Sequence, residues 1–268
     1  MTGRVVVIGS LYLLVTADVE AIPRAGETAT ALRTRRAVAG RGVAQALAVQ
    51  RAAAPVRLVA AVGDDDAGRW CADRLAQDGL ETRLQVVAHE QTGNLVVVSE
   101  GREGGEEGAT LVVPGANTAL DCGTALADTG PDDVILVQLD VPPAVVAEIL
   151  READRRQTRV VVNASPFATV DPAAAALADP LVVGERDAAL LADVGLVPGS
   201  LCVTFGRAGA VWNGLRVDSD DLGSPAMTPG GTEAFCGALA AALAAGANRA
   251  SALRAAVAAT GEPAVPGS

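Results

Sequence analysis

Arg4-Val5-Val6-Val7-Ile8-Gly9-Ser10, at the start of the chain, is a short run of β-branched apolar residues that ends in glycine and serine. Such a run, closed by residues typical of turns, predicts a buried strand. Similar runs recur along the chain and alternate with segments rich in alanine and leucine. This alternation is the pattern of strands joined by crossover helices in a mostly parallel sheet.

The repeated pattern predicts the elements of the core. The predicted strands cover residues 4–8, 56–62, 134–139, 159–163, 181–183 and 201–205, and the clearest helices cover 41–53 and 67–78. Loop residues and then helix-forming sequence follow the later strands. The sequence therefore predicts an α/β fold with a doubly wound, mostly parallel sheet flanked by helices.

Two stretches depart from this alternation, residues 11–38 and 91–113. Both have strand-like composition with polar positions, and the second contains the turn-forming run Glu100-Gly101-Arg102-Glu103-Gly104-Gly105. We expect them to form a small β-sheet lid. Because no linker or repeat divides the chain, we expect one domain over residues 1–268, with only the terminal 263–268 loose.

The composition excludes several classes of partner. The chain has 268 residues, 21 basic against 32 acidic side chains and a net charge of −11, and every basic residue is arginine. The absence of lysine rules out Schiff-base chemistry and a phosphate-gripping lysine. The acidic balance and the 2% of aromatic residues argue against nucleic acid. With no apolar run of about 20 residues and no signal-peptide pattern, we expect no membrane contact and a cytoplasmic protein.

Cysteine and histidine offer little chemistry. The four cysteines are widely separated and form no C-x-x-C pair, so neither a zinc site nor a redox motif has its spacing. The one histidine, His89, has no evident catalytic companion. We therefore predict no metal held by these residues.

The richest candidate for chemistry is the segment Thr228-Pro229-Gly230-Gly231-Thr232-Glu233. Its two glycines lead into a helix predicted to begin near Thr232, where backbone N–H groups could converge on an anion. Glu233 would then lie beside that anion and could accept a proton from a substrate hydroxyl during phosphoryl transfer. The alternative is a glycine loop whose acidic residue complements the helix dipole.

Two further glycine-rich turns are weaker signals. Ala39-Gly40-Arg41-Gly42 precedes a predicted helix and could bind a ligand, or could be a plain turn with a solvated arginine. Thr204-Phe205-Gly206-Arg207-Ala208-Gly209-Ala210 follows a core strand and could cradle a nucleotide, or could be an ordinary turn into a hairpin.

Taken in order, these segments resemble one family over nearly the whole chain. The matching motifs also include Val7-Ile8-Gly9-Ser10, Ile22-Pro23-Arg24-Ala25-Gly26-Glu27-Thr28, Val62-Gly63-Asp64-Asp65-Asp66-Ala67-Gly68, Thr92-Gly93, Pro114-Gly115-Ala116-Asn117, Val137-Gln138-Leu139-Asp140 and Asn163-Ala164-Ser165-Pro166. The chain resembles the ribokinase-like (PfkB-type) carbohydrate kinases.

The resemblance implies ATP-dependent phosphorylation of a sugar hydroxyl, with ATP and Mg²⁺ as cofactors, on a Rossmann-like core whose β lid suggests a homodimer. It assigns the catalytic base to Glu233 and the anion hole to Gly230, Gly231 and Thr232. It places the nucleotide near Glu185, Asp187, Thr204, Phe205, Gly206 and Gly209. It places the small-molecule substrate near Tyr12, Leu14, Gly40, Arg41, Gly42 and Asp140.

The chain departs from the family at several site positions. Glu233 replaces an aspartate, and Tyr12 and Leu14 replace an asparagine and a sugar-gripping aspartate. Ala44 replaces an asparagine, Arg41 a lysine, and the Asn-x-x-Glu element reads Gly184-Glu185-Arg186-Asp187. The loop for a monovalent cation has Met227 and Pro229 in place of aspartate and threonine, which puts dependence on that ion in doubt. Two hypotheses follow: an ATP-dependent kinase that phosphorylates a sugar or sugar-like hydroxyl, or a catalytically impaired pseudokinase that binds a small ligand or partner in the same cleft.

Overall fold

The computed structural model describes residues 3–101, 108–164, 171–193, 198–219 and 231–261. Its core sheet contains β1 (Val5–Ile8), β4 (Val56–Gly63), β5 (Glu81–Val87), β8 (Val134–Gln138), β9 (Arg159–Asn163), β10 (Leu181–Gly184), β11 (Leu201–Thr204), β12 (Ala210–Trp212) and β13 (Leu215–Val217). The strand order is β13-β12-β11-β10-β9-β8-β1-β4-β5. All pairs from β11 to β5 are parallel, and β12 and β13 add an antiparallel edge.

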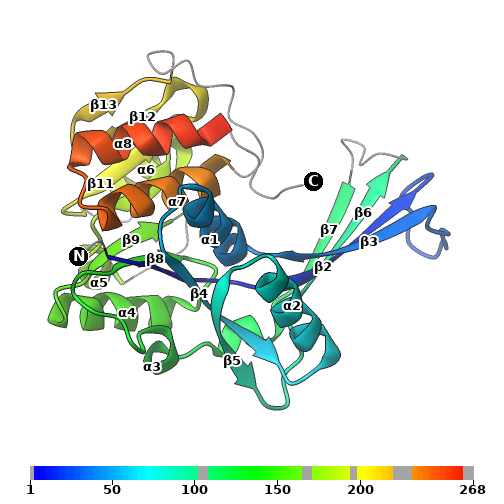
Figure 1. Cartoon of the computed structure of the whole chain (residues 1–268). Coiled ribbons are helices and arrows are strands. Elements are labelled where there is room, and N and C mark those ends of the chain that lie inside the picture. The colour runs from blue at the N-terminus through cyan, green and yellow to red at the C-terminus, as the bar shows by residue number, and fades with distance from the viewer. Residues whose placement is uncertain (1–2, 102–107, 165–170, 194–197, 220–230, 262–268) are drawn as a thin grey trace.

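Helices cover both faces of this sheet. They are α1 (Arg41–Arg51), α2 (Asp66–Gln77), α3 (Cys122–Ala125), α4 (Pro143–Arg155), α5 (Pro172–Ala175), α6 (Glu185–Asp193), α7 (Gly231–Ala244) and α8 (Arg249–Ala258). Val5 and Val7 pack into the cluster formed with α1, α2, α7 and α8, whereas Val6 and Ile8 pack into the cluster formed with α3, α4 and α5. The uniformly apolar strand thus serves two cores, one on each face (Figure 1).

A second, smaller sheet projects from the edge of the core. It contains β2 (Tyr12–Val19), β3 (Arg33–Ala39), β6 (Asn94–Glu100) and β7 (Gly108–Val113), in the order β3-β2-β6-β7. These strands come from the two stretches predicted to form a lid. In Figure 1 they extend away from the helices as a separate layer.

The predicted architecture is confirmed: the sheet is mostly parallel and flanked by helices, and the small sheet stands apart from it. Element boundaries shift by only one or two residues; the first helix, for example, ends at Arg51. The strand β5 is not evident from the sequence, because Glu81, Arg83 and Gln85 interrupt its apolar pattern. Among the helices described, none combines the length and apolarity needed to span a lipid bilayer.

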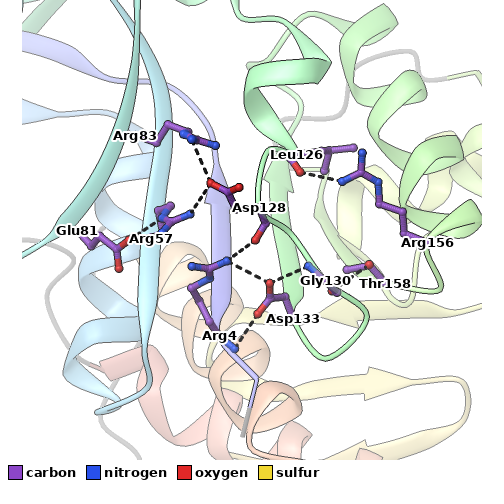
Figure 2. A network of polar contacts seen from close by, with 10 residues as sticks. All are labelled: Arg4, Arg57, Glu81, Arg83, Leu126, Asp128, Gly130, Asp133, Arg156 and Thr158. Carbon is purple, nitrogen blue, oxygen red and sulfur yellow. Dashed lines mark hydrogen bonds and ion pairs between the residues drawn. The ribbon is translucent and has the colours of Figure 1, made fainter. Parts of the chain in front are cut away.

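A polar network secures the edge of the core sheet at which the parallel strands begin (Figure 2). Asp133, just before β8, accepts hydrogen bonds from the backbone N of Arg4 at 3.1 Å and of Gly130 at 3.0 Å. The Arg4 guanidinium donates to the Asp128 carbonyl at 2.6 Å, and Arg83 pairs with the Asp128 carboxylate at 3.1 Å. These contacts tie the connection before β8 to β1 and β5, at the amino edge of the parallel strands.

Candidate active site

At the carboxyl edge of the sheet, β1 and β8 place two polar residues together. Ser10 follows β1 and Asp140 follows β8, and the two parallel strands are adjacent. The Ser10 hydroxyl donates a hydrogen bond to Asp140 Oδ2 and accepts one from the backbone N of Arg41 at 3.2 Å. Ser10 thus joins the end of β8 to the first residue of α1.

Glycines allow this close approach of strand end and helix start. A Cβ on Gly42 would lie 2.8 Å from the carbonyl carbon of Gly9, and a Cβ on Gly40 would lie 2.4 Å from the Ser10 carbonyl oxygen. Gly40 also has φ +124°, which other residues rarely adopt. The turn at residues 40–42 is therefore packed against the end of β1, and its glycines are required by contact.

The two carboxylate oxygens of Asp140 differ in their hydrogen bonding. Oδ2 binds the Ser10 hydroxyl, whereas Oδ1 is buried and has no hydrogen-bond partner within the described part of the chain. Burial raises the pKa of the Asp140 carboxyl, although the Ser10 hydrogen bond and the Arg41 guanidinium favour its ionised form. Oδ1 is an acceptor to which a ligand hydroxyl could donate.

Glu233 lies in the first turn of α7, as predicted, and faces the same cluster. Its Oε1 is 3.9 Å from Nη1 of Arg41, and its side chain is 15% exposed. The Arg41 guanidinium thus pairs with Glu233 while it also acts on Asp140. Gly231 is the first residue of α7 and Thr232 the second, so the proposed anion-hole backbone is at the N-terminus of a 14-residue helix. Gly230, Met227 and Pro229 lie outside the described residues.

The lid contributes Tyr12 and Leu14. Tyr12 is only 8% exposed, and burial, followed by the charge of Asp140, raises the pKa of its phenol. A Cβ on Gly93 would come within 2.8 Å of the Tyr12 ring, so the ring packs on this glycine of the lid. Leu14 is half-buried two residues further along β2. The structure therefore brings Tyr12, Gly40, Arg41, Gly42, Asp140 and Glu233 into one cluster, with Leu14 beside it on the lid.

The residues assigned to a nucleotide form a second group further along the same edge. Gly184 at the end of β10 pairs with Thr204 at the end of β11, and Thr204 Oγ1 donates to the Val183 carbonyl at 3.2 Å. The turn after β11 has Gly206 at φ +58° and Gly209 at φ +95°. A Cβ on Gly209 would lie 2.0 Å from the Val217 carbonyl oxygen, so this tight turn also depends on glycine.

Side chains flank that turn. Phe205 is half-buried, and the Arg216 guanidinium lies 5.9 Å from the centroid of its ring. Glu185 is exposed and Asp187 half-buried in the first turn of α6. The two groups share the carboxyl edge of one sheet, separated by β9 in the strand order.

Two carboxylates in the first turn of α6 could contribute to a magnesium site. Mg²⁺ prefers oxygen ligands and often keeps several waters, with one or two carboxylates and substrate phosphates completing its shell. Asp187 and Glu185 supply such carboxylates. No group of three or more histidine, cysteine or acidic side chains suited to hold a metal occurs among the residues with described positions. Glu185 and Asp187 would hold a magnesium ion only together with other ligands, such as phosphate oxygens and water.

Ser10 and the buried amides beneath the cluster were not predicted from the sequence as site residues. Gln138 Nε2 donates to Gln45 Oε1, and both side chains are fully buried. Ser10 could have been found because it directly follows the first strand. The Gln45–Gln138 pair had no comparable signal, since the two residues lie 93 positions apart.

A comparison with models of protein families shows the family to which the chain belongs. The model of the pfkB family carbohydrate kinases matches residues 2–197. The chain belongs to the pfkB family of carbohydrate kinases. The matched residues contain Tyr12, Arg41 and Asp140, while α7 with Glu233 lies beyond them.

Relatives of this pfkB protein extend the similarity along the chain. The ribokinase of Bacillus subtilis is 29% identical over 94% of this chain and 89% of its own length. A ribokinase from Cryptococcus neoformans solved with ADP has a TM-score of 0.76 at 26% identity, covering 97% of this chain and 93% of its own. The Arabidopsis thaliana ribokinase complexed with ribose and ATP has a TM-score of 0.78 at 21% identity, covering 97% and 92%. None of these findings favours the pseudokinase hypothesis over the kinase hypothesis.

Proposed function

We propose that this protein is an ATP-dependent kinase that transfers the γ-phosphoryl group of ATP to a hydroxyl of a sugar or sugar-like small molecule. The observation that supports it most is the position of Glu233. Its carboxylate lies at the N-terminus of α7, 3.9 Å from Arg41 and in the cluster with Asp140. Phosphoryl transfer needs a proton acceptor beside a site that stabilises the transferring group, and this helix start offers both.

In the proposed reaction, Glu233 accepts the proton of the substrate hydroxyl as its oxygen forms a bond to the γ-phosphorus. The bond from the γ-phosphorus to the bridging oxygen of ADP breaks, and ADP leaves with that electron pair. The backbone N–H groups of Gly230, Gly231 and Thr232, with the helix dipole of α7, stabilise the negative charge on the transferring group. Mg²⁺, when bound, neutralises charge on the phosphates.

The remaining residues of the cluster position the acceptor. We assign Asp140 Oδ1 to a second hydroxyl of the substrate, because this buried oxygen has no partner within the described residues. Ser10 holds the other oxygen of the carboxylate, and so fixes its orientation. The ion pair between Arg41 and Glu233 holds the Glu233 carboxylate near the hydroxyl that is phosphorylated. Tyr12 and Leu14 lie on the lid side of this cluster.

The nucleotide is assigned to the ends of β10 and β11. Glu185, Asp187, Thr204, Phe205, Gly206 and Gly209 are the residues proposed to contact it. The ADP and ATP complexes of the two ribokinases of similar fold support this use of ATP. The exposed outer strand of the lid also supports a homodimer formed through the lids.

ATP consumption by the purified protein tests this proposal. Free pentoses, hexoses, their glycosides and nucleosides would be offered one at a time, with and without Mg²⁺. We expect magnesium-dependent ADP formation with at least one acceptor, and a phosphorylated acceptor in equal amount by mass spectrometry. No turnover with any acceptor, while ATP binds, would overturn the kinase proposal and favour a pseudokinase.

A further inference from the structure

The register of the lid sheet places an apolar strip beside the proposed acceptor site. Leu14 on β2 pairs with Ala37 on β3 and with Leu95 on β6. Directly paired residues project to the same face of a sheet, as do residues two apart along a strand. Leu14, Ala37 and Leu95 therefore share the face of Tyr12. We call these three residues the lid strip.

The other face of the lid is occupied by the core. Leu13 and Val38 project to that face and are buried in the same cluster as Val43 of α1 and Leu75 of α2. The face with Tyr12 is therefore directed away from α1 and α2. Tyr12 lies close enough to Asp140 and Arg41 for their charges to act on its phenol. The lid strip thus continues from Tyr12 on the side of the acceptor site.

Polar groups bound the strip at the core end and, on β2 and β3, at the outer end, whereas on β6 the apolar surface continues from Leu95 to Val97. Near the core lie Asp140 and Arg41, and further out along the same lid face lie Thr16 and Arg35, which pair with each other across β2 and β3. Between them, the side chains of the lid strip carry no hydrogen-bond donor or acceptor, and each is half-buried. A ligand that extends from Asp140 over the lid would meet polar groups first and only apolar surface next.

This arrangement of polar and apolar surface would favour some acceptors over others. Free hydroxyls placed against the lid strip would exchange hydrogen bonds with water for apolar contact, which is unfavourable. An apolar ring at the same place would leave water and gain contact with Leu14 and Leu95, while Tyr12 offers an aromatic edge or face. A site gains specificity from such differences between competing ligands.

We infer that the preferred acceptor is a sugar joined to an apolar aromatic ring, such as an aryl glycoside, and that Leu14 is a specificity-determining residue which contacts this ring. The inference rests on the proposed function and names the substrate class of the same site. The sugar hydroxyls would lie toward Asp140 and Glu233, and the ring would lie on the lid strip.

A matched set of acceptors tests this preference. D-ribose, methyl β-D-ribofuranoside and phenyl β-D-ribofuranoside share one sugar and differ only at the anomeric position. For the wild-type protein we expect kcat/KM for the phenyl glycoside to exceed that for the methyl glycoside by at least tenfold. Equal values for the two glycosides, or a preference for free ribose, would overturn the inference while leaving the kinase proposal intact.

Substitutions at Leu14 assign the preference to the lid strip. Leu14→Asp should lower kcat/KM for the phenyl glycoside at least tenfold and change that for free ribose less, and Leu14→Ala should reduce the preference without introducing charge. The control is Leu177→Asp, the same chemical change at a side chain that is 36% exposed and remote from the lid. If Leu14→Asp and Leu177→Asp both keep the wild-type ratio of kcat/KM for the phenyl glycoside to kcat/KM for free ribose, Leu14 does not determine specificity.

Direct binding separates this inference from the kinase proposal. Calorimetry would measure the three ribosides with the wild-type protein in the absence of ATP. Tighter binding of the phenyl glycoside than of the methyl glycoside, lost in Leu14→Asp, supports the inference even if no acceptor is phosphorylated. Equal or undetectable binding of both glycosides, with ribose turned over normally, would contradict it.

Discussion

Asp140 shows at the scale of one residue how the proposed site differs from the rest of the core. One carboxylate oxygen is held by Ser10, and the other is buried without a partner among the described groups. A stable core would satisfy or remove such an oxygen, because an unpaired buried acceptor costs roughly 1–3 kcal/mol. The residue is better explained by a ligand hydroxyl that donates to this oxygen when bound.

We expect Asp140→Asn to increase stability at neutral pH and to impair catalysis. Burial raises the pKa of Asp140 in the folded state, so the folded protein binds the proton more tightly than the unfolded chain. The contribution of this carboxyl to stability is therefore greatest below its unfolded pKa and is lost as pH rises through its folded pKa. Urea unfolding at pH 4 and pH 8 measures this effect.

The free energy of unfolding of Asp140→Asn minus that of wild type should become more positive from pH 4 to pH 8. Taking the difference removes the contributions of the titrating groups that do not interact with Asp140. In kinetic assays the variant should show at least a tenfold lower kcat/KM, since an amide cannot offer the same charged acceptor to the substrate. A stability difference that falls with rising pH would contradict this account of Asp140.

At the scale of elements, the contact between the end of β1 and the start of α1 builds the acceptor site. Gly9 and Gly42 bring the two backbones together, and Ser10 connects them to β8. The hydroxyl, the guanidinium and the carboxylate of the cluster all depend on this approach. A side chain at residue 42 would separate the helix from the strand.

Gly42→Ala should therefore destabilise the protein and reduce its activity. The added Cβ would lie 2.8–2.9 Å from three backbone atoms of Gly9 and Ser10, which cannot move independently. Overpacking of this kind costs about 1–3 kcal/mol, which urea unfolding would detect. Gly130→Ala is the matched control, because a Cβ there has no neighbour within 4 Å. Equal stability of the two variants would show that the approach at Gly42 is not tight.

The sequence predicts the elements of this site better than their contacts. Uniformly apolar strands such as β1 and β8 are evident from composition, and a glycine pair before an alanine-rich helix indicates where α7 begins. The edge strand β5 was missed because it alternates polar residues, and the three-residue strands β12 and β13 are too short for periodicity to resolve. The Arg41–Glu233 ion pair depends on the packing of α1 against α7, which no local pattern contains.

At the scale of the whole molecule, the outer strand of the lid is exposed to an unusual degree. Leu111, Val112 and Val113 of β7 are 62%, 52% and 41% exposed, and β7 lies at the edge of its sheet. An apolar edge strand is a surface suited to pairing with another chain. This surface supports the proposed homodimer through the lids.

Sedimentation velocity tests the homodimer. We expect wild-type protein at micromolar concentration to sediment at twice the chain mass of 26.8 kDa, and Leu111→Asp to sediment as a monomer. Val86→Asp is the control, since Val86 is 61% exposed on β5 of the core sheet. A wild-type monomer at all concentrations, or a dimer unaffected by Leu111→Asp, would exclude this interface.

The rate of phosphoryl transfer in Glu233 variants tests the central claim most directly. With the best acceptor, we expect Glu233→Gln to lower kcat by about 10²–10⁴-fold, because the amide cannot accept the hydroxyl proton, while the Kd for ATP changes little. Glu148→Gln, the same change on the exposed surface of α4, should match wild type. A Glu233→Gln protein that forms phosphorylated product at the wild-type rate would show that Glu233 is not the base.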